Sequence, residues 1–184
     1  MAATSPRGPA DPGRRDRIVE ATLEVIAAAG VAGASHRRIA AAAGVPLGSM
    51  TYYFTGIEQV LREAFTRYAD RAADAFDAAL DRATTPAEAL DVVAETILRS
   101  GPDHGGDAVV AYELYTLAAR EPAFRDITER WMARSRAALE RHLDPLTARL
   151  LDALIEGLSV HRTLDRDPVD AADAAEAVRR LARG

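Results

Sequence analysis

The stretch "SHRRIAAAAGVPLGSMTYYF" occupies residues 35–54 and decides how the N-terminal part of the 184-residue chain folds. Ser35 is a favourable N-cap residue, and the apolar run that follows it stops at Gly44, a residue type that ends helices. The segment "VPLG" then leads into a second short helix that ends near Phe54. Two short helices joined by a tight turn form a helix-turn-helix, in which the second helix enters the major groove of DNA.

Three consecutive aromatic residues, 52–54, end this stretch in a chain that is only 5% aromatic. At about 100° per residue, Met50 and Phe54 share one face of the short helix, which we take as the inward face. Hydroxyl groups on the other face can bond phosphates, and an outward glycine lets another backbone approach. Helical geometry alone leaves open whether the tyrosines contact DNA or cover a neighbouring helix. The outward and flanking positions are Gly48, Ser49, Thr51, Tyr52 and Tyr53.

The first turn of the preceding helix carries His36, Arg37 and Arg38 directly after Ser35. Positive charge at a helix N-terminus opposes the helix dipole. An anion that docks on the free backbone amides, such as a DNA phosphate, would explain this placement. Ordinary surface arginines remain the alternative explanation.

Composition narrows the class of protein. The chain has no cysteine, so it forms neither disulfides nor thiolate metal sites, as expected of a cytoplasmic protein. No apolar run approaches the roughly 20 residues of a membrane span, and residues 1–13 lack the apolar core of a secretory signal and are expected to form a disordered arm. The net charge is −5, but residues 1–56 hold six arginines against four acids. A mildly basic head on an acidic body suits phosphate contact, although chance explains this distribution equally well.

From residue 14 onward, apolar residues recur at helical spacing and no strand pattern is found, which predicts an all-α chain of about nine helices. The first helix places Ile18, Thr22 and Ile26 inward and ends at Gly30. Capping-box patterns open the fourth and fifth helices, the fifth ends at Gly101, and a loop over 101–107 precedes the sixth. The predicted starts of the later helices are Thr55, Thr85, residue 107, Pro122, Asp144-Pro145 and Asp167-Pro168.

Residues 14–65, "RRDRIVEATLEVIAAAGVAGASHRRIAAAAGVPLGSMTYYFTGIEQVLREAF", resemble the DNA-binding domain of the tetracycline-repressor (TetR) family of bacterial transcriptional regulators. The helix spacing and both helix-turn-helix segments fall in register with that family, and "LDALIEGLSVHRTL" (151–164) is similar to its eighth helix. The resemblance implies a helix-turn-helix DNA-binding domain over 14–56 and a helical ligand-binding and dimerisation domain over 57–184.

The resemblance implies DNA contacts on both helices of the motif, including Leu47, which the helical wheel places on the face of Met50. Thr51 stands where the family usually has tyrosine, and Ile57 stands where it has lysine, so one phosphate contact is missing. Arg14, Arg15 or the amides after Thr55 could replace that contact. The full set of predicted DNA-binding residues is Arg14, Arg15, Ser35, His36, Arg37, Arg38, Leu47, Gly48, Ser49, Thr51, Tyr52 and Tyr53.

The family's architecture also implies a ligand pocket among the fourth to seventh helices and a homodimer formed by the eighth and ninth. Packing in the core is the commoner role of aromatic and apolar side chains at helical spacing, and it competes with both assignments; the polar groups of Tyr68, Tyr112 and Trp131 favour a pocket. The predicted ligand-binding residues are Phe65, Tyr68, Phe76, Tyr112, Tyr115 and Trp131. The predicted dimer-interface residues are Leu150, Leu154, Gly157, Leu158, His161, Ala174 and Val178.

Motifs of catalysis are not found: there is no nucleophile elbow, phosphate loop or HExxH zinc motif. Asp103, His104 and Asp107 could hold a metal, but a polar turn is the simpler interpretation. We therefore expect no enzyme, cofactor or metal. The expected function is a cytoplasmic repressor that binds a palindromic operator as a homodimer and is released by a small-molecule effector. The alternatives are a transcriptional activator and a helical ligand-binding module without sequence-specific DNA binding.

Overall fold

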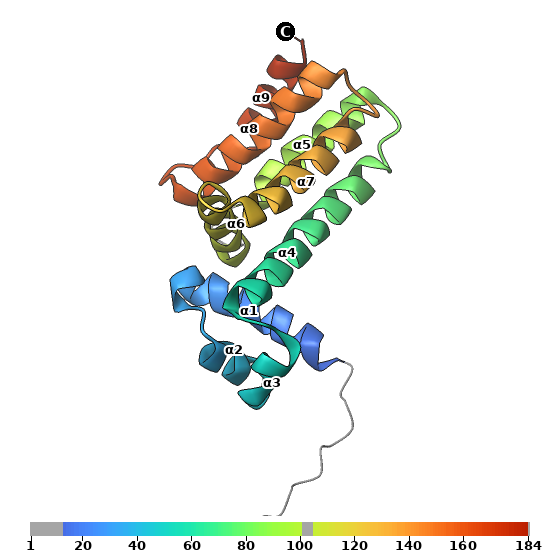
Figure 1. Cartoon of the computed structure of the whole chain (residues 1–184). Helices are drawn as coiled ribbons and strands as arrows, with labels where there is room; N and C mark the ends of the chain where they lie inside the picture. The colour runs from blue at the N-terminus through green and yellow to red at the C-terminus, as the bar shows by residue number, and fades with distance from the viewer. Residues whose placement is uncertain (1–12, 101–104, 184) are drawn as a thin grey trace, which may run out of the picture.

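The computed structural model describes residues 13–100 and 105–183, and these residues form nine α-helices and no β-strand (Figure 1). The predicted all-α class is therefore confirmed. The predicted arm, except for Gly13, and the end of the fifth helix at Gly101 lie outside the described residues. The helices are α1 (Arg14–Gly33), α2 (His36–Ala42), α3 (Gly48–Tyr53), α4 (Ile57–Leu80), α5 (Pro86–Arg99), α6 (Gly105–Ala118), α7 (Pro122–Leu139), α8 (Pro145–Leu164) and α9 (Ala171–Arg183).

Three of the predicted N-caps are made by the expected side chains. The Ser35 hydroxyl accepts from the backbone N–H of Arg38 at 3.3 Å, which starts α2. Thr85 does the same for α5, and the Asp144 carboxylate accepts from two backbone amides of α8 at 3.0 and 3.1 Å. Because each cap satisfies amides that have no partner within the helix, these starts could be predicted from local sequence.

The predicted capping box at Thr55 is wrong. Gly56, which has no side chain, precedes α4, and Glu58 takes no part in a cap. The Gln59 amide oxygen instead accepts from the Thr55 backbone N–H at 2.8 Å and from its hydroxyl at 3.0 Å. The segment before α4 is thus held by the side chain of Gln59, one position after the predicted Glu58.

The predicted start of the ninth helix at Asp167-Pro168 is also wrong. Helix α9 begins at Ala171, where the Asp170 carboxylate accepts from the backbone N–H of Asp173 at 2.9 Å. Asp167 and Asp170 both precede helical sequence, but only the Asp170 carboxylate lies within reach of a free backbone amide in the first turn of α9.

The first straight segment of α1 ends at Gly30, as predicted, because this residue leaves the helical conformation and forms a kink. Its φ of +65° is left-handed, and the helix resumes and continues to Gly33. A β-carbon at this position would lie 2.4 Å from the Glu113 carboxylate of α6, so glycine suits both the backbone and the contact.

Helix α4 contributes side chains to each of the three hydrophobic cores formed by the described residues. Its Val60 packs with α1–α3 in the head, Phe65 packs with α1, α6 and α7 at the junction, and Phe76 packs with α5, α8 and α9 in the body. Figure 1 shows this helix running from the α1–α3 head up into the body. The head core therefore extends into α4, and the division of the chain between residues 56 and 57 remains a prediction.

Candidate DNA-binding surface and ligand cavity

Helix α3 has one buried face and one face turned to solvent. Met50 is fully buried and Phe54 is 3% exposed, which fixes the inward face as the residue spacing predicts. Tyr52 is 76% exposed and Leu47 is 51% exposed, so both present apolar surface outside the core. Tyr53 is half-buried, and its ring meets that of Tyr52 edge-on at 4.8 Å. The pair projects an aromatic ridge from the end of α3.

The prediction that Ser49 points outward is wrong. Ser49 is 7% exposed, because the short helix turns the position beside Met50 toward the core. Gly48 is exposed, and a β-carbon built there would meet no atom within 4 Å. Thr51 is also exposed, and its hydroxyl donates to the Gly48 carbonyl at 3.2 Å. Gly48 and Thr51 therefore remain on the accessible side of α3.

The candidate residues of α2 differ in their freedom to contact DNA. Arg37 is exposed and has no hydrogen-bond or ion-pair partner among the described residues. Arg38 donates from Nη1 to the Gly33 carbonyl at 3.2 Å and so braces the turn before α2. His36 is half-buried, and its Nε2 is covered without a hydrogen-bond partner in the described chain. A surface hollow joins α2 to α3 and α4, lined by Ala34, Ser35, His36, Arg37, Leu47, Thr51 and Ile57.

The two arginines at the start of α1, Arg14 and Arg15, are less free to contact DNA than Arg37 is. Arg14 is half-buried, and Arg15 forms an ion pair with Glu63 of α4 at 2.5 Å. The Arg15 guanidinium also lies 5.3 Å from the centre of the Phe54 ring. Glu63 accepts a further hydrogen bond from Gln59 at 3.0 Å. A phosphate contact by Arg15 would have to compete with these partners.

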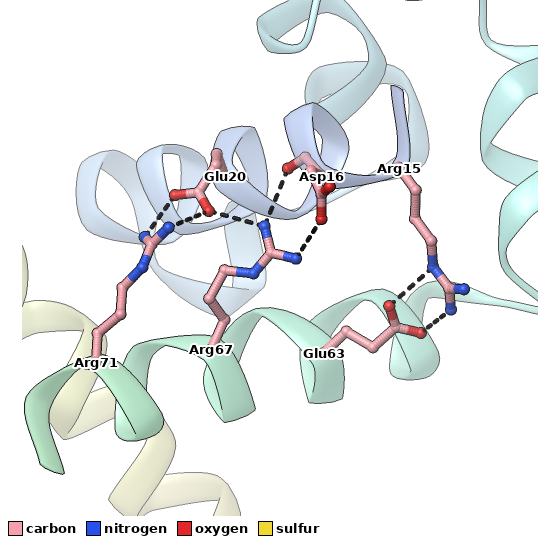
Figure 2. A network of polar contacts seen from close by, with 6 residues as sticks. All are labelled: Arg15, Asp16, Glu20, Glu63, Arg67 and Arg71. Atoms are coloured by element: carbon pink, nitrogen blue, oxygen red, sulfur yellow. Dashed lines mark hydrogen bonds and ion pairs between the residues drawn. The ribbon is translucent and has the colours of Figure 1, made fainter. Parts of the chain in front are cut away.

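A polar network joins α1 to α4 beside this surface (Figure 2). Arg67 contacts Asp16 at 2.6 Å and Glu20 at 2.9 Å, and Arg71 donates two hydrogen bonds to Glu20 at 2.6 and 2.7 Å. The Arg71 guanidinium, with Arg67, lowers the pKa of the Glu20 carboxyl. This polar network and the hydrophobic core that α4 shares with α1–α3 both hold the head against α4.

A cavity of about 310 Å³ lies in the body, among α4, α5, α6, α7 and α8. It is lined by five of the six predicted ligand-binding residues: Tyr68, Phe76, Tyr112, Tyr115 and Trp131. Phe65 does not line it. This side chain is fully buried at the junction of head and body, where it packs edge-on against Phe124 at 5.9 Å.

Three of these aromatic residues form one side of the cavity. The Trp131 ring meets Tyr68 edge-on at 5.6 Å and lies nearly parallel to Tyr115 at 6.0 Å, with 19° between the planes. The Tyr68 hydroxyl donates to the backbone carbonyl of Asp107 at 3.1 Å. Burial raises the pKa of both tyrosines, so they stay neutral donors at physiological pH.

Glu156 of α8 also lines the cavity, and it was not among the predicted residues. Its Oε2 accepts from the Tyr115 hydroxyl at 2.7 Å. Burial raises the pKa of the Glu156 carboxyl; the Tyr115 hydrogen bond acts in the opposite direction, and the nearby charge of Asp152 adds to the rise. The available signal was the pair of acids Asp152 and Glu156, four residues apart on α8 and therefore on one helical face.

The predicted dimer-interface residues fall into two groups. Ala174 and Val178 are 0% and 1% exposed, because α9 packs them into the body core, so these two predictions are wrong. Leu154 and Leu158 are half-buried against the same core. The solvent-facing side of α8 is instead a stripe of small and apolar residues with His161 among them, at spacings of three and four: Leu146, Leu150, Ala153, Gly157, His161 and Leu164.

Two further predictions concern absent features. None of the helices in the described part of the chain is long and apolar enough to cross a membrane. Within residues 13–100 and 105–183, no three histidine or acidic side chains are grouped so that they could hold a metal ion. Asp103 and His104, which the sequence offered as metal ligands, lie outside these residues.

Comparison with known proteins supports the same assignment of the two parts. Residues 18–64 match the family described as bacterial regulatory proteins of the tetR family, and residues 84–184 match the tetracyclin repressor-like C-terminal domain. Over 163 residues, the chain is 26% identical to the HTH-type transcriptional regulator PksA of Bacillus subtilis, which covers 83% of this chain and 80% of PksA.

Two solved structures are similar over nearly the whole length. The transcriptional regulator SCO7518 of Streptomyces coelicolor A3(2) is 54% identical, with a TM-score of 0.87 over 94% of this chain and all of SCO7518. The multidrug binding protein EbrR, solved in complex with imidazole, is 36% identical, with a TM-score of 0.74 over 94% of this chain and 96% of EbrR. Matches to the DNA-binding and C-terminal domains, together with these relatives, show that the chain belongs to the TetR family of transcriptional regulators.

Proposed function

We propose that this TetR-family regulator is a ligand-responsive repressor that acts in the cytoplasm. In this proposal a homodimer binds a palindromic operator through α2 and α3, and a small molecule in the body cavity releases it. The observation that carries the proposal is the course of α4. Its Val60 belongs to the head core, and its Tyr68 and Phe76, two to four turns along the same helix, line the cavity.

Contact with DNA is assigned to the accessible residues of the head. Tyr52 and Leu47 project from α3, Gly48 leaves room for a close approach, and the unpaired Arg37 supplies positive charge beside them. Hydroxyl and guanidinium groups suit phosphate oxygens, whereas exposed apolar side chains suit base edges such as the thymine methyl. Ser49 and Arg38 are assigned to structure, because their side chains face the core and the α1–α2 turn.

Dimerisation is assigned to the exposed stripe of α8. Leu150 is 44% exposed and Leu146 is 65% exposed, which leaves apolar surface without a partner in the protomer. Gly157 on the same face, with open space around it, permits close helix packing. A two-fold axis through this face would pair the stripe with itself and direct two heads to one side of a DNA duplex.

The effector is assigned to the cavity among α4–α8, and its aromatic lining favours a planar aromatic molecule. The relative EbrR has been solved in complexes with ethidium, proflavin and malachite green as well as imidazole. We extend this kind of ligand to the present chain. At about 310 Å³, the cavity lies at the small end of the roughly 300–1,000 Å³ range of small-molecule sites.

Release would follow from a change in the position of α4. A ligand that displaces Tyr68 shifts the helix, and the head follows because the α1–α4 network and the shared core hold it. The operator-binding state needs recognition helices about 34–36 Å apart, one turn of DNA. The effector must bind the state with a different spacing more tightly, since equal affinity for both states shifts nothing.

Fluorescence anisotropy with DNA from upstream of the protein's own gene tests the proposal. We expect salt-sensitive, sequence-dependent binding that is lost in the double variant Arg37→Ala/Tyr52→Ala and kept in Arg120→Ala, which removes one exposed charge from the body. A cavity ligand that does not itself bind DNA should weaken the complex. Binding that is independent of sequence, or that survives the double variant, would refute the proposal. A reporter assay separates repression from activation.

A further inference from the structure

We infer that Glu156 is the counter-ion for a positively charged aromatic ligand in the cavity, and that this ligand binds the ionised Glu156 carboxylate in preference to the protonated acid. The inference rests on the proposed role of the cavity as the effector site. It adds the charge of the ligand and a pH dependence, neither of which follows from an aromatic lining.

Glu156 has no compensating positive charge among the described residues. Glu156 is half-buried, and its one hydrogen bond to a side chain comes from the neutral Tyr115 hydroxyl. No arginine or histidine of the described chain pairs with it. Its neighbour Asp152 is different, since Arg136 contacts that carboxylate at 3.2 Å. Carboxylates in protein interiors are normally paired with a cation, so a ligand cation is the missing partner of Glu156.

The surrounding groups do not supply this partner. The titratable and charged groups around Glu156 and its cavity are Tyr68 from α4, Arg99 from α5, Asp107, Tyr112 and Tyr115 from α6, Arg136 from α7, and Asp152 from α8. Neither arginine contacts Glu156: Arg136 pairs with Asp152, and Arg99, which lines the cavity with an exposed side chain, donates to the Thr96 hydroxyl at 3.0 Å. The remaining groups are tyrosine hydroxyls and the acids Asp107 and Asp152. These groups favour a cation in the cavity.

An aromatic wall lies beside this carboxyl. Trp131 lies 5.6 Å from Tyr68 and 6.0 Å from Tyr115, and the Tyr115 hydroxyl reaches Glu156. The faces of such rings attract cations, and desolvation strengthens the attraction. The same wall that stacks on a planar ligand therefore adds to the preference for positive charge.

Protonation follows from the burial of the carboxyl. Burial raises the pKa of Glu156 in the free protein and favours the uncharged acid. A bound cation stabilises the carboxylate and lowers that pKa again. At a pH where the free carboxyl is protonated, the acid O–H bond therefore breaks and the proton leaves to water as the ion pair forms. Affinity for a permanent cation is then full above the pKa of the free protein and falls as the pH decreases through it.

The test compares N-methylacridinium, a permanent cation, with acridine, its neutral parent ring at pH 8. Titration calorimetry on the full chain without DNA measures binding, and quenching of Trp131, the single tryptophan, reports occupancy of the cavity. The variant is Glu156→Gln, which keeps an oxygen for the Tyr115 hydroxyl. The control is Glu95→Gln, an exposed position on α5 outside the cavity.

We expect Glu156→Gln to weaken N-methylacridinium by about 10- to 100-fold while acridine keeps its affinity. In the native chain, the affinity for the cation should fall as the pH decreases through the raised pKa of Glu156, and in that pH range the binding heat should differ between buffers because a proton is released. Both effects should vanish in Glu156→Gln. An equal loss of affinity for both probes in Glu156→Gln would mean that Glu156 has a structural role and is not the counter-ion. Native binding of both probes with equal affinity, independent of pH, would overturn the inference but leave an aromatic effector in place. Binding of neither probe would overturn it together with the aromatic effector. Because no DNA is present, none of these results depends on operator binding.

Discussion

The network between α1 and α4 gives a stability prediction that can be worked from its geometry. Glu20 accepts two hydrogen bonds from Arg71 at 2.6 and 2.7 Å and one from Arg67 at 2.9 Å. Replacement by glutamine keeps the size of the side chain and one acceptor oxygen, but it removes the charge from both pairs. Asp16 still holds Arg67 at 2.6 Å, so the change acts on Glu20 alone.

The expected cost is modest because the network is partly open to solvent. The side chains of Glu20, Arg67 and Arg71 are 38%, 28% and 59% exposed. Ion pairs at such sites contribute about 0–1 kcal/mol each after screening, so the loss of two amounts to about 1–2 kcal/mol. For a chain of this size each kcal/mol corresponds to a fall of about 2–4 °C in the melting temperature. The control is Glu24→Gln, an exposed position one turn further along α1.

The pH dependence gives the same prediction a second test. The pKa of Glu20 is lowered in the folded chain, mainly by the Arg71 hydrogen bond, so folding favours the ionised form. Its contribution is complete above the ordinary glutamate value of about 4.3 and is lost as the pH falls through the lower folded value. Urea unfolding at pH 7 measures the full contribution, and at pH 3, below the ordinary glutamate value, it measures a reduced one. Equal stability of Glu20→Gln and Glu24→Gln at pH 7, or a difference that persists undiminished at pH 3, would refute this role of the Glu20 charge.

Four further substitutions test other parts of the structure. Arg37→Ala and Tyr52→Ala should each weaken operator binding by about 10-fold without changing the far-UV circular dichroism spectrum, since both side chains are exposed; unchanged affinity would remove that residue from the interface. Leu150→Asp should convert the dimer to a folded monomer in sedimentation equilibrium, and a persistent dimer would place the interface elsewhere. Gly30→Ala should cost about 1–3 kcal/mol in urea unfolding, because its φ of +65° and ψ of 176° lie in a region that residues other than glycine rarely adopt; a neutral result would show that the kink relaxes easily.

Features set by neighbouring residues could be predicted from sequence. The caps at Ser35, Thr85 and Asp144 could be predicted because, in each, the side-chain oxygen and the backbone amide that it accepts from lie within three residues of each other. The inward placement of Met50 and Phe54 followed from helical spacing in the same way. These local preferences were enough to predict nine helices and the helix-turn-helix.

Features that depend on how helices are rotated and packed could not be predicted in this way. Glu20 and Arg71 are 51 residues apart, and only the packing of α1 on α4 brings them together. Val178 was assigned to the dimer interface because the resemblance implied a role for α9 without fixing which of its faces is buried. Glu156 is not among the predicted residues because the rotation of α8, which turns this side chain to the cavity, is set by packing and not by local sequence.

Selection of bound DNA from a random pool tests the central claim most directly, since the claim is that a dimer of this chain reads an operator through α3. The account predicts enrichment of an inverted repeat whose half-sites are centred about 10–10.5 base pairs apart, or a multiple of that spacing. The Arg37→Ala/Tyr52→Ala variant should enrich nothing from the same pool. Enrichment of a single unrepeated site, or no enrichment by the native chain, would contradict the account.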